Sequence, residues 1–369
     1  MLSPLLLGWR LCARMMSELD LKRNLPTWVH ARQKFDVEWQ CENQRDRTPT
    51  WSLNIEDRLR EDENQRIVKS PKVIATIPQI LPGQKEFVAY RCLFPKRGKY
   101  VIGPTQASTR FPLGLIQGVV KLDSMAEVSV APVLGKLVHN WERQIRSQVH
   151  GEQAQQRQRG TEQDEFHSLR EWRSGDSNRQ VHWRSSAKLG KLLIKQFDQK
   201  SGRDFALAVD LHFDSTDGSN LENIERILSC SATMIANLSR EVQGKVAVAV
   251  CGQESSLFSD KYNRELINLV MQSLATAQAG SNIQLGEAIE ELFLRVSAET
   301  PVLILSTRPR PDSMADFIPA SSAELLRSAE RSTRWIQVGT SEFRKLFQMP
   351  NETVVNDALQ SAAVEEVGQ

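Results

Sequence analysis

Residues 205–210 read FALAVD, five apolar residues followed by an acid. A short continuous apolar run of this kind is typical of a strand buried on both faces of a sheet. Two similar runs follow, KVAVAVC at residues 245–251 and PVLILS at residues 301–306, and a last strand is expected at 335–338. Apolar residues at helical spacing mark helices at 221–242, 266–277, 285–296 and 323–331. Buried strands alternating with amphipathic helices predict a mostly parallel sheet covered on both faces.

The chain before this region has the pattern of short strands rather than helices. Residues 35–41, FDVEWQC, alternate apolar and polar side chains, as a half-buried strand does. Further strands are expected at 51–55, 73–77, 87–94, 100–102 and 128–131. Strands at this spacing without a helical period predict an antiparallel β-sandwich over residues 25–135.

Composition limits the classes of function. The chain has 369 residues, too many for one ordinary domain. It carries 47 Lys and Arg against 45 Asp and Glu, which gives a net charge of +2. The overall charge therefore selects neither nucleic acid nor an acidic membrane as a partner. The five cysteines contain no C-x-x-C spacing, which argues against a zinc knuckle or a disulfide framework and favours a reducing compartment.

Both ends and the middle of the chain differ from the two folded regions. Residues 1–24 are expected to be a leader, for which two interpretations stay open: a frayed or amphipathic segment, and a remnant of a membrane helix. No apolar run is long enough to span a bilayer. Residues 136–164 have the composition of a polar linker, and residues 351–369 that of a flexible tail.

Residues 165–200, the signature segment, carry the most information. Asp176 follows a Ser-Gly turn and is placed to cap a helix that runs to Lys188. Gly190 then supplies a left-handed stop, and a strand is expected at 192–197. Arg179 and Trp183 are four residues apart on that helix, so their side chains can stack, and His182 and Ser186 share another face. We interpret these positions as structural.

The signature segment resembles that of the DUF58 family, a domain of unknown function. Sixteen positions match in order over thirty-one residues: Glu165, Phe166, Leu169, Arg170, Trp172, Gly175, Asp176, Arg179, Val181, Trp183, Ser186, Ala187, Gly190, Leu192, Ile194 and Lys195. The β-rich half is also similar to the family at residues 25–26, 96–100 and 112–115. The resemblance implies an α+β multidomain chain with a β-sandwich, a signature segment packed on the next domain, and a doubly wound α/β domain like von Willebrand factor A over residues 201–350.

Domains of this type often hold a divalent cation on a D-x-S-x-S loop, which the resemblance places at residues 210–214. Here Asp210 is present, but both serines are replaced, and Asp214 is the second weak candidate ligand. Arg308 brings positive charge where a later loop would supply an Asp. We therefore expect no cofactor, with Mg²⁺ at Asp210 and Asp214 as the alternative.

The preferred function is non-catalytic: a protein–protein interaction or scaffold module. The resemblance implies a MoxR-type AAA-plus ATPase and other von Willebrand A proteins as partners, met by loops that carry Asp210, His212, Asp214 and Arg308. An enzyme is not expected, since Asp176, His182 and Ser185 lie within ten residues and cannot easily form a hydrolase triad.

The alternative function is nucleic-acid binding through residues 170–203, which hold nine Lys and Arg against three Asp and Glu. The expected location is cytoplasmic, with peripheral membrane contact left open, and the resemblance adds that family members are usually membrane-anchored.

Overall fold

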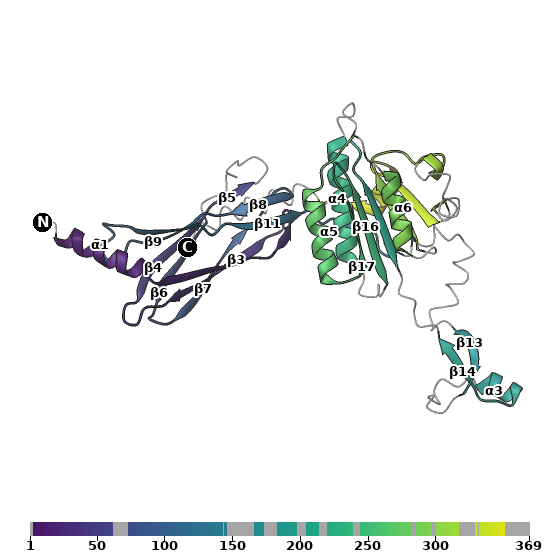
Figure 1. The fold of residues 1–369 in the computed structure, drawn as a ribbon, viewed down its shortest axis with the longest axis horizontal. Helices are drawn as coiled ribbons and strands as arrows, with labels where there is room; N and C mark the ends of the chain where they lie inside the picture. The colour runs from purple at the N-terminus through teal and green to yellow at the C-terminus, as the bar shows by residue number, and fades with distance from the viewer. Residues whose placement is uncertain are drawn as a thin grey trace.

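The computed structural model shows a chain that combines β-sheets with helices, so the predicted α+β class is confirmed. It describes residues 3–61, 73–142, 144–145, 166–172, 183–197, 204–213, 220–238, 244–281, 283, 285–296, 300–316, 329–330 and 332–350. Figure 1 shows a β-rich part at the N-terminal end and an α/β part beyond it, joined along the long axis of the molecule.

Three sheets around one core form the β-rich part. The first is antiparallel and contains β1 (Leu19–Asn24), β3 (Phe35–Asn43) and β7 (Lys85–Cys92). The second, also antiparallel, contains β10 (Gly118–Leu122), β9 (Thr105–Thr109), β4 (Thr50–Asp57) and β6 (Val73–Ile80). The third contains β2 (Trp28–His30), β11 (Ala126–Ala131), β8 (Gly98–Ile102) and β5 (Leu59–Glu61), with β2 and β11 parallel. Alternate residues of β3, namely Val37, Trp39 and Cys41, are fully buried in the shared core.

Residues 3–24, expected to belong to a leader, fold against the β-rich part, and the amphipathic interpretation of the leader agrees with this. Residues 3–16 form α1 (Ser3–Met16), and Cys12, Met15 and Met16 on one face of it are buried against the β-rich part. Residues 19–24 are β1, paired with β3 along its whole length. Among the described helices none is long and apolar enough to cross a membrane.

The α/β part is built on a five-stranded sheet in the order β17-β16-β15-β18-β19. Its strands are β15 (Phe205–Asp210), β16 (Lys245–Cys251), β17 (Ser255–Lys261), β18 (Val302–Ser306) and β19 (Thr333–Gln337). All neighbours are parallel except the hairpin of β16 with β17. The predicted parallel sheet is therefore present, with one antiparallel edge strand that the sequence pattern did not indicate.

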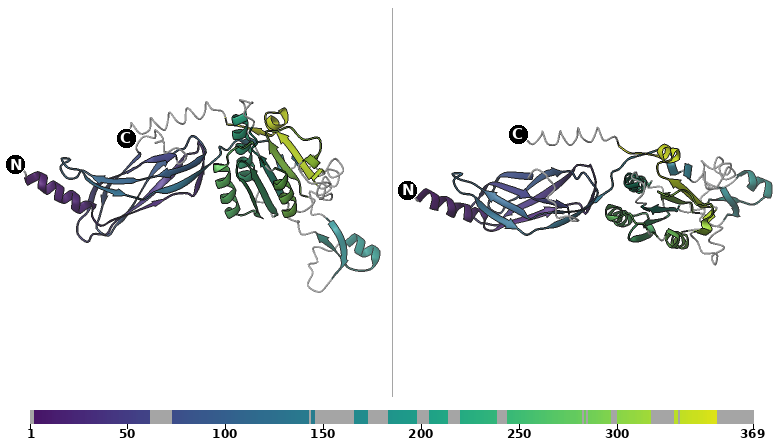
Figure 2. Two further views of the ribbon diagram at one scale, coloured as in Figure 1. Left: turned by 45° about the horizontal axis from the view of Figure 1, so that its top comes forward. Right: turned by 90° about the horizontal axis from the view of Figure 1, so that it is seen from above.

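Helices cover both faces of this sheet (Figure 2). Phe205, Leu207 and Val209 point into a core shared with α4 (Asn220–Asn237) and α5 (Arg264–Thr276). Ala206 and Ala208 point to the other side, where α6 (Leu285–Arg295) packs. Small residues on that face let α6 lie close to the strands. The helix expected at 323–331 falls mostly outside the described residues.

The predicted linker over 136–164 begins inside this folded part. Residues 136–137 are β12 (Lys136–Leu137), paired with β20 (Phe347–Gln348), which follows α8 (Ser341–Leu346). Trp141 is buried and meets Phe205 edge to face, with ring centroids 5.7 Å apart. These apolar contacts correct the linker's start; residues 146–165 and the tail at 351–369 lie outside the described residues.

The signature segment forms a small unit of its own. β13 (Phe166–Glu171) pairs antiparallel with β14 (Leu193–Phe197), and α3 (Trp183–Leu189) precedes β14. Figures 1 and 2 show this unit apart from the five-stranded sheet and its helices, so the expected packing of the signature segment on the next domain is not found among the described residues. The two strands bond to each other through their inner edges and form a two-stranded sheet.

The β-rich and α/β parts meet through specific polar contacts. The Arg97 guanidinium donates to the carbonyl oxygens of Leu274 and Ala277, at 3.0 and 2.7 Å, and pairs with Glu225 at 2.9 Å. Those carbonyls lie at the C-terminal end of α5, where a cation is favourable. The Trp28 indole N–H also donates to Asn268 Oδ1 at 2.7 Å. These contacts fix one part against the other.

A buried ion pair organises the β-rich core. Arg23 on β1 lies 2.9 Å from Asp57 on β4, with side chains 4% and 1% exposed. Asp57 also accepts from the Trp39 indole N–H at 3.1 Å and from the hydroxyls of Tyr90 and Thr105. Burial and the adjacent Asp57 carboxylate raise the pKa of Tyr90, so its hydroxyl stays a donor. The pair thus ties β1 to the second sheet.

Arg23→Met is expected to destabilise the chain by about 3–5 kcal/mol, because it leaves the Asp57 carboxylate buried without its cation. Urea unfolding, monitored by tryptophan fluorescence, measures the change in the free energy of unfolding. Arg91→Met is the matched control: Arg91 pairs with Asp36 at 2.9 Å, but these side chains are 62% and 58% exposed. Its loss is expected to stay below about 1 kcal/mol. Equal effects of the two substitutions would contradict a structural role for the buried pair.

Candidate functional site

Three strand ends meet at one edge of the five-stranded sheet, here called the carboxyl edge. Asp210 ends β15, with Cys251 of β16 on one side of it and Ser306 of β18 on the other. All three residues are fully buried. Ligand sites of open α/β sheets lie at this kind of edge, outside the carboxyl ends of the strands. The predicted interaction loops that carry Asp210 and Arg308 therefore both begin at this edge.

Arg308 neutralises the buried carboxylate of Asp210. Its Nε lies 2.9 Å from Oδ2 and its Nη2 3.1 Å from Oδ1, a two-point contact that matches the planes of the two groups. The Ser306 hydroxyl donates to the same Oδ2 at 2.7 Å. Both carboxylate oxygens are thus engaged, while the Arg308 side chain keeps 26% of its surface exposed.

The backbone around Arg308 is held by side chains from neighbouring strands. The Arg308 N–H donates to the Ser306 hydroxyl at 2.9 Å, and the Trp335 indole N–H donates to the Arg308 carbonyl at 3.1 Å. The Thr307 hydroxyl donates to the His212 carbonyl at 2.7 Å, which links the loops that follow β18 and β15. The guanidinium is therefore positioned by a fixed loop.

Two glycines let the other loops approach this edge. A Cβ on Gly252 would lie 2.3 Å from the Gln278 carbonyl oxygen, so only glycine fits between the two segments. Gly280 forms a parallel bridge with His212, and its carbonyl accepts from the Phe213 N–H at 2.9 Å. The Nδ1 atom of His212 is buried and has no hydrogen-bond partner in the described part of the chain.

The donor set does not fit a divalent cation. A guanidinium occupies the face of Asp210 that a metal would need, and repulsion from it opposes a second positive charge. No group of three His, Cys, Asp or Glu side chains lies together among the described residues, and Asp214 falls outside them. The described residues of the carboxyl edge therefore present a fixed guanidinium at Asp210.

The Cys251 thiol at this edge is not activated as a nucleophile. Burial raises the pKa of the Cys251 thiol to about 12, with a further rise from Asp210 and an opposing contribution from Arg308. A thiol with so high a pKa stays protonated near neutral pH and is a poor nucleophile.

The structure describes only part of the predicted signature set. Ser186 is buried, and its hydroxyl accepts from the Leu193 N–H at 2.9 Å, so it joins α3 to β14 as a structural residue. Trp172 and Trp183 are 38% and 65% exposed. Arg170 and Lys195 lie on β13 and β14 at their register positions. Gly175, Asp176, Arg179 and His182, with the predicted cap and the Arg179–Trp183 stack, lie outside the described residues.

Sequence reasoning missed two members of the site, Ser306 and Trp335. Ser306 was taken as the last residue of a strand, and its position directly before the turn to Arg308 was the signal that it could reach Asp210. Trp335 lies on β19, thirty residues from β18 in sequence, and its hydrogen bond to Arg308 depends on sheet order, which the sequence pattern does not give.

Millimolar Mg²⁺ or Mn²⁺ is expected to leave the melting temperature of the chain unchanged, because Asp210 has no free carboxylate oxygen to offer. Ligand binding to the folded state would raise the melting temperature, so a tight site would be visible. Differential scanning fluorimetry at matched ionic strength measures this. A clear rise that disappears in Asp210→Ala would show that a cation displaces Arg308.

Comparison with known families gives one match. Residues 168–337 match the model described as "Protein of unknown function DUF58". This range begins within β13 and ends at the end of β19, and so contains most of the signature segment and the whole five-stranded sheet. No curated protein matches the chain at a significant level.

Solved structures give only local similarities. The CARDB domain of PF1109 from Pyrococcus furiosus is 15% identical, over 31% of this chain and 94% of that one, with a TM-score of 0.20. Superoxide reductase from Ignicoccus hospitalis is 17% identical, over 31% and 82%, with a TM-score of 0.19. A β-glucosidase from Listeria innocua is 17% identical, over 32% and 17%, with a TM-score of 0.22. Scores this low carry no argument about fold or function.

The resemblance noted in the sequence is therefore confirmed over residues 168–337, the part of this chain that matches the DUF58 family.

Proposed function

We propose that this chain is a non-catalytic protein–protein interaction module that works with a MoxR-type AAA-plus ATPase and with von Willebrand A proteins. In this proposal the β-rich part is a β-sandwich, and the α/β part is a von Willebrand factor A-like domain whose carboxyl edge receives the partner. The proposal rests on the DUF58 match and on one observation, the pairing of Asp210 with Arg308.

The Asp210–Arg308 pair supports recognition without a metal. In von Willebrand A domains with a D-x-S-x-S loop, a cation at this edge supplies the positive charge that a partner meets. In this chain the Arg308 guanidinium, held at two points by Asp210, supplies the positive charge, and part of the Arg308 side chain faces solvent. Arginine is well suited to interfaces, because its planar donors pair with carboxylates and its hydration is weak.

The junction between the two parts supports a scaffold. Arg97 from the β8 hairpin holds the C-terminal end of α5, and the Gly135 N–H donates to the Thr233 hydroxyl of α4 at 2.9 Å. The Arg97 bond to Ala277 lies next to Gln278, which borders the carboxyl edge. A partner bound at that edge is therefore held at a fixed position relative to the β-rich part.

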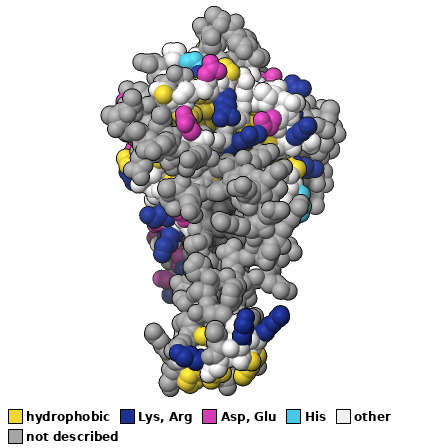
Figure 3. Space-filling view, turned by 90° about the vertical axis from the view of Figure 1, so that its right-hand side faces the viewer, with side chains coloured by type: hydrophobic (Ala, Val, Ile, Leu, Met, Phe, Trp, Pro, Cys, Tyr) yellow, Lys and Arg dark blue, Asp and Glu magenta, His cyan; other side chains and the backbone are white. Residues whose placement is uncertain are grey.

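The signature segment carries the alternative function, nucleic-acid binding. Trp172, Trp183 and Leu192 are exposed on it, with Arg184, Lys188 and Lys191 also exposed. Figure 3 shows hydrophobic and basic side chains together at the free end of this unit. Aromatic and basic side chains in one place can bind single strands by stacking and phosphate contact. The near-neutral net charge of the chain favours the protein partner instead.

Biolayer interferometry with a purified MoxR-type ATPase from the same genome tests the proposal. The full chain is expected to bind, and Arg310→Glu, an exposed position beside Arg308, to weaken binding about tenfold or more by reversing a charge at the carboxyl edge. Arg91→Glu, on the far β-rich part, is the control and is expected to bind as the unmodified chain does.

A single-stranded oligonucleotide serves as the competing ligand in the same assay. Absence of ATPase binding, together with oligonucleotide binding that falls steeply with salt and is lost in Trp183→Ala, would replace the proposal by its alternative.

A further inference from the structure

The strand β17 forms one edge of the five-stranded sheet, and its outer side has no paired strand among the described residues. All seven of its residues pair with β16 without a register shift, from Ser255 to Lys261. The residues 255–259, SSLFS, contain no charge and no proline, and the two charged residues, Asp260 and Lys261, are the last of the strand. An unbulged, uncharged edge of this kind is a template for pairing with a further strand.

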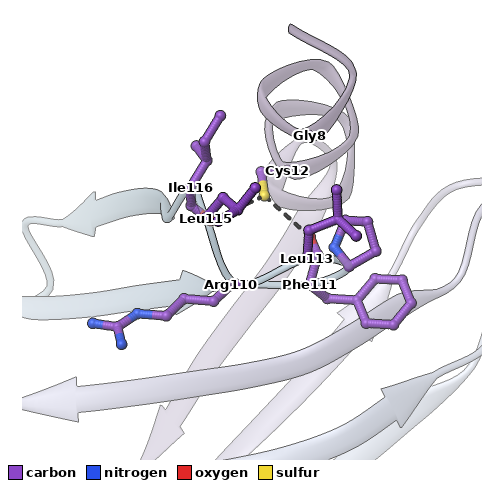
Figure 4. Close-up of a pocket in the computed structure, with 9 residues that line it drawn as sticks. Gly8, Cys12, Arg110, Phe111, Leu113, Leu115 and Ile116 are labelled. Carbon is purple, nitrogen blue, oxygen red and sulfur yellow. Dashed lines mark hydrogen bonds between the residues drawn. The ribbon is translucent and has the colours of Figure 1, made fainter. Parts of the chain in front are cut away.

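The other long edge strands of the β-rich and α/β parts are protected. Each of those with at least five described residues contains a charge or a proline: Lys22 in β1, Pro78 in β6, Arg91 in β7, Lys121 in β10 and Arg334 in β19. β10 also packs against α1, whose Cys12 thiol donates to the Phe111 carbonyl at 3.1 Å in the loop that leads to this strand (Figure 4). Such guards oppose the addition of a strand, and residues 255–259 of β17 lack them.

Both faces of β17 carry apolar side chains that are only partly covered. Phe258 packs against the core on the α5 side of the sheet, and Leu257 packs against the core on the α6 side, yet both side chains are only partly buried. Figure 1 shows β17 between these two helices. A neighbouring strand would bury more of both side chains, as the strands inside the sheet bury theirs.

An exposed leucine on α5 lies beside the same edge. The hydroxyl oxygens of Ser256 on β17 and Ser273 on α5 are 2.8 Å apart, and Leu269 precedes Ser273 by one helical turn, so it lies on the same side of the helix. Leu269 is 46% exposed. Because α5 runs back along β17, and one turn of helix is about as long as two residues of strand, Leu269 is level with Phe258. The centre of the edge is therefore apolar on both the strand and the helix.

The residues of this edge favour a second copy of the chain as the added strand. Two β17 strands can pair antiparallel about a centre at Phe258, so that the two phenyl rings form a cross-strand pair, which stabilises a sheet. Asp260 of one copy then lies opposite Ser256 of the other. Lys261 lies opposite Ser255 in the same way, so no like charges are opposed. A second copy matches this pattern by symmetry, because a two-fold interface uses the same surface on both chains.

We propose that two copies of this chain associate through β17, which joins the two five-stranded sheets into one continuous sheet with Phe258 and Leu269 at its centre. The two-fold axis is perpendicular to the sheet, so both copies keep α5 on the same face of it. The β-rich part packs against α5 in each copy, and both β-rich parts therefore lie on that face. The inference is independent of the partner proposed above.

Sedimentation velocity of the full chain over a range of concentrations tests the inference. A dimer that forms as the concentration rises is expected. Leu269→Asp is expected to weaken this association more than about tenfold, because the substitution places two carboxylates together at the centre of the interface. Leu221→Asp is the matched control: Leu221 is 63% exposed at the start of α4, outside the proposed interface, and this variant is expected to associate as the unmodified chain does.

Two substitutions of Ser255 test the register of the pair. Ser255 is exposed, so neither is expected to disturb the fold, which the melting temperature checks. Ser255→Glu is expected to tighten the dimer about threefold or more, since the new carboxylate faces Lys261 of the other copy, and Ser255→Lys to weaken it by a similar factor. A chain that stays monomeric at every concentration would overturn the inference. So would a dimer that Leu269→Asp leaves unchanged, or one that both substitutions of Ser255 change in the same direction.

Discussion

A fully buried carboxylate at the end of the central strand is the constraint around which the α/β part is arranged. Asp210 has no exposure to water, and an isolated buried charge of this kind is too costly for a fold to keep. Arg308 and Ser306 satisfy it, and Trp335 and Thr307 hold the loop that delivers Arg308. Three of the five strands contribute to this arrangement, namely β15, β18 and β19.

The β-rich part also contains a buried ion pair between an arginine and an aspartate. Arg23 and Asp57 form a buried pair supported by Trp39, whose ring also lies 4.7 Å from the Arg23 guanidinium carbon. In both parts an arginine links the carboxylate of one element to another element far away in sequence. A third arginine, Arg97, joins the two parts at the C-terminal end of α5. Such pairs specify which elements meet, even where their net stabilisation is modest.

The sequence pattern was sufficient to predict the strands whose side chains are completely buried. The run FALAVD predicted β15 with its observed bounds, and KVAVAVC predicted β16, because strands buried on both faces are apolar at every position. β17, with the sequence SSLFSDK, was missed because an antiparallel edge strand is half exposed and mostly polar. α1 and β1 were taken as a leader, because local pattern cannot show that β1 pairs with β3 or that α1 packs against the second sheet.

The candidate site was predictable in part. The sequence showed that both serines of the D-x-S-x-S loop are replaced and that Arg308 places a positive charge in a later loop. The two-point contact with Asp210 was not, because it depends on parallel pairing that places Ser306 beside Asp210. Gly190 was correctly expected as a left-handed stop, with φ of 66°, since glycine adopts that conformation without steric cost.

A double-mutant cycle on Asp210→Asn and Arg308→Met, read by urea unfolding, tests the central claim most directly. If the two side chains neutralise each other in a buried site, each single substitution should cost about 3–5 kcal/mol. The double variant should then lose far less than the sum, with a coupling energy of at least about 2 kcal/mol. Effects that add to within about 0.5 kcal/mol would show that Asp210 and Arg308 act independently, and would contradict the account.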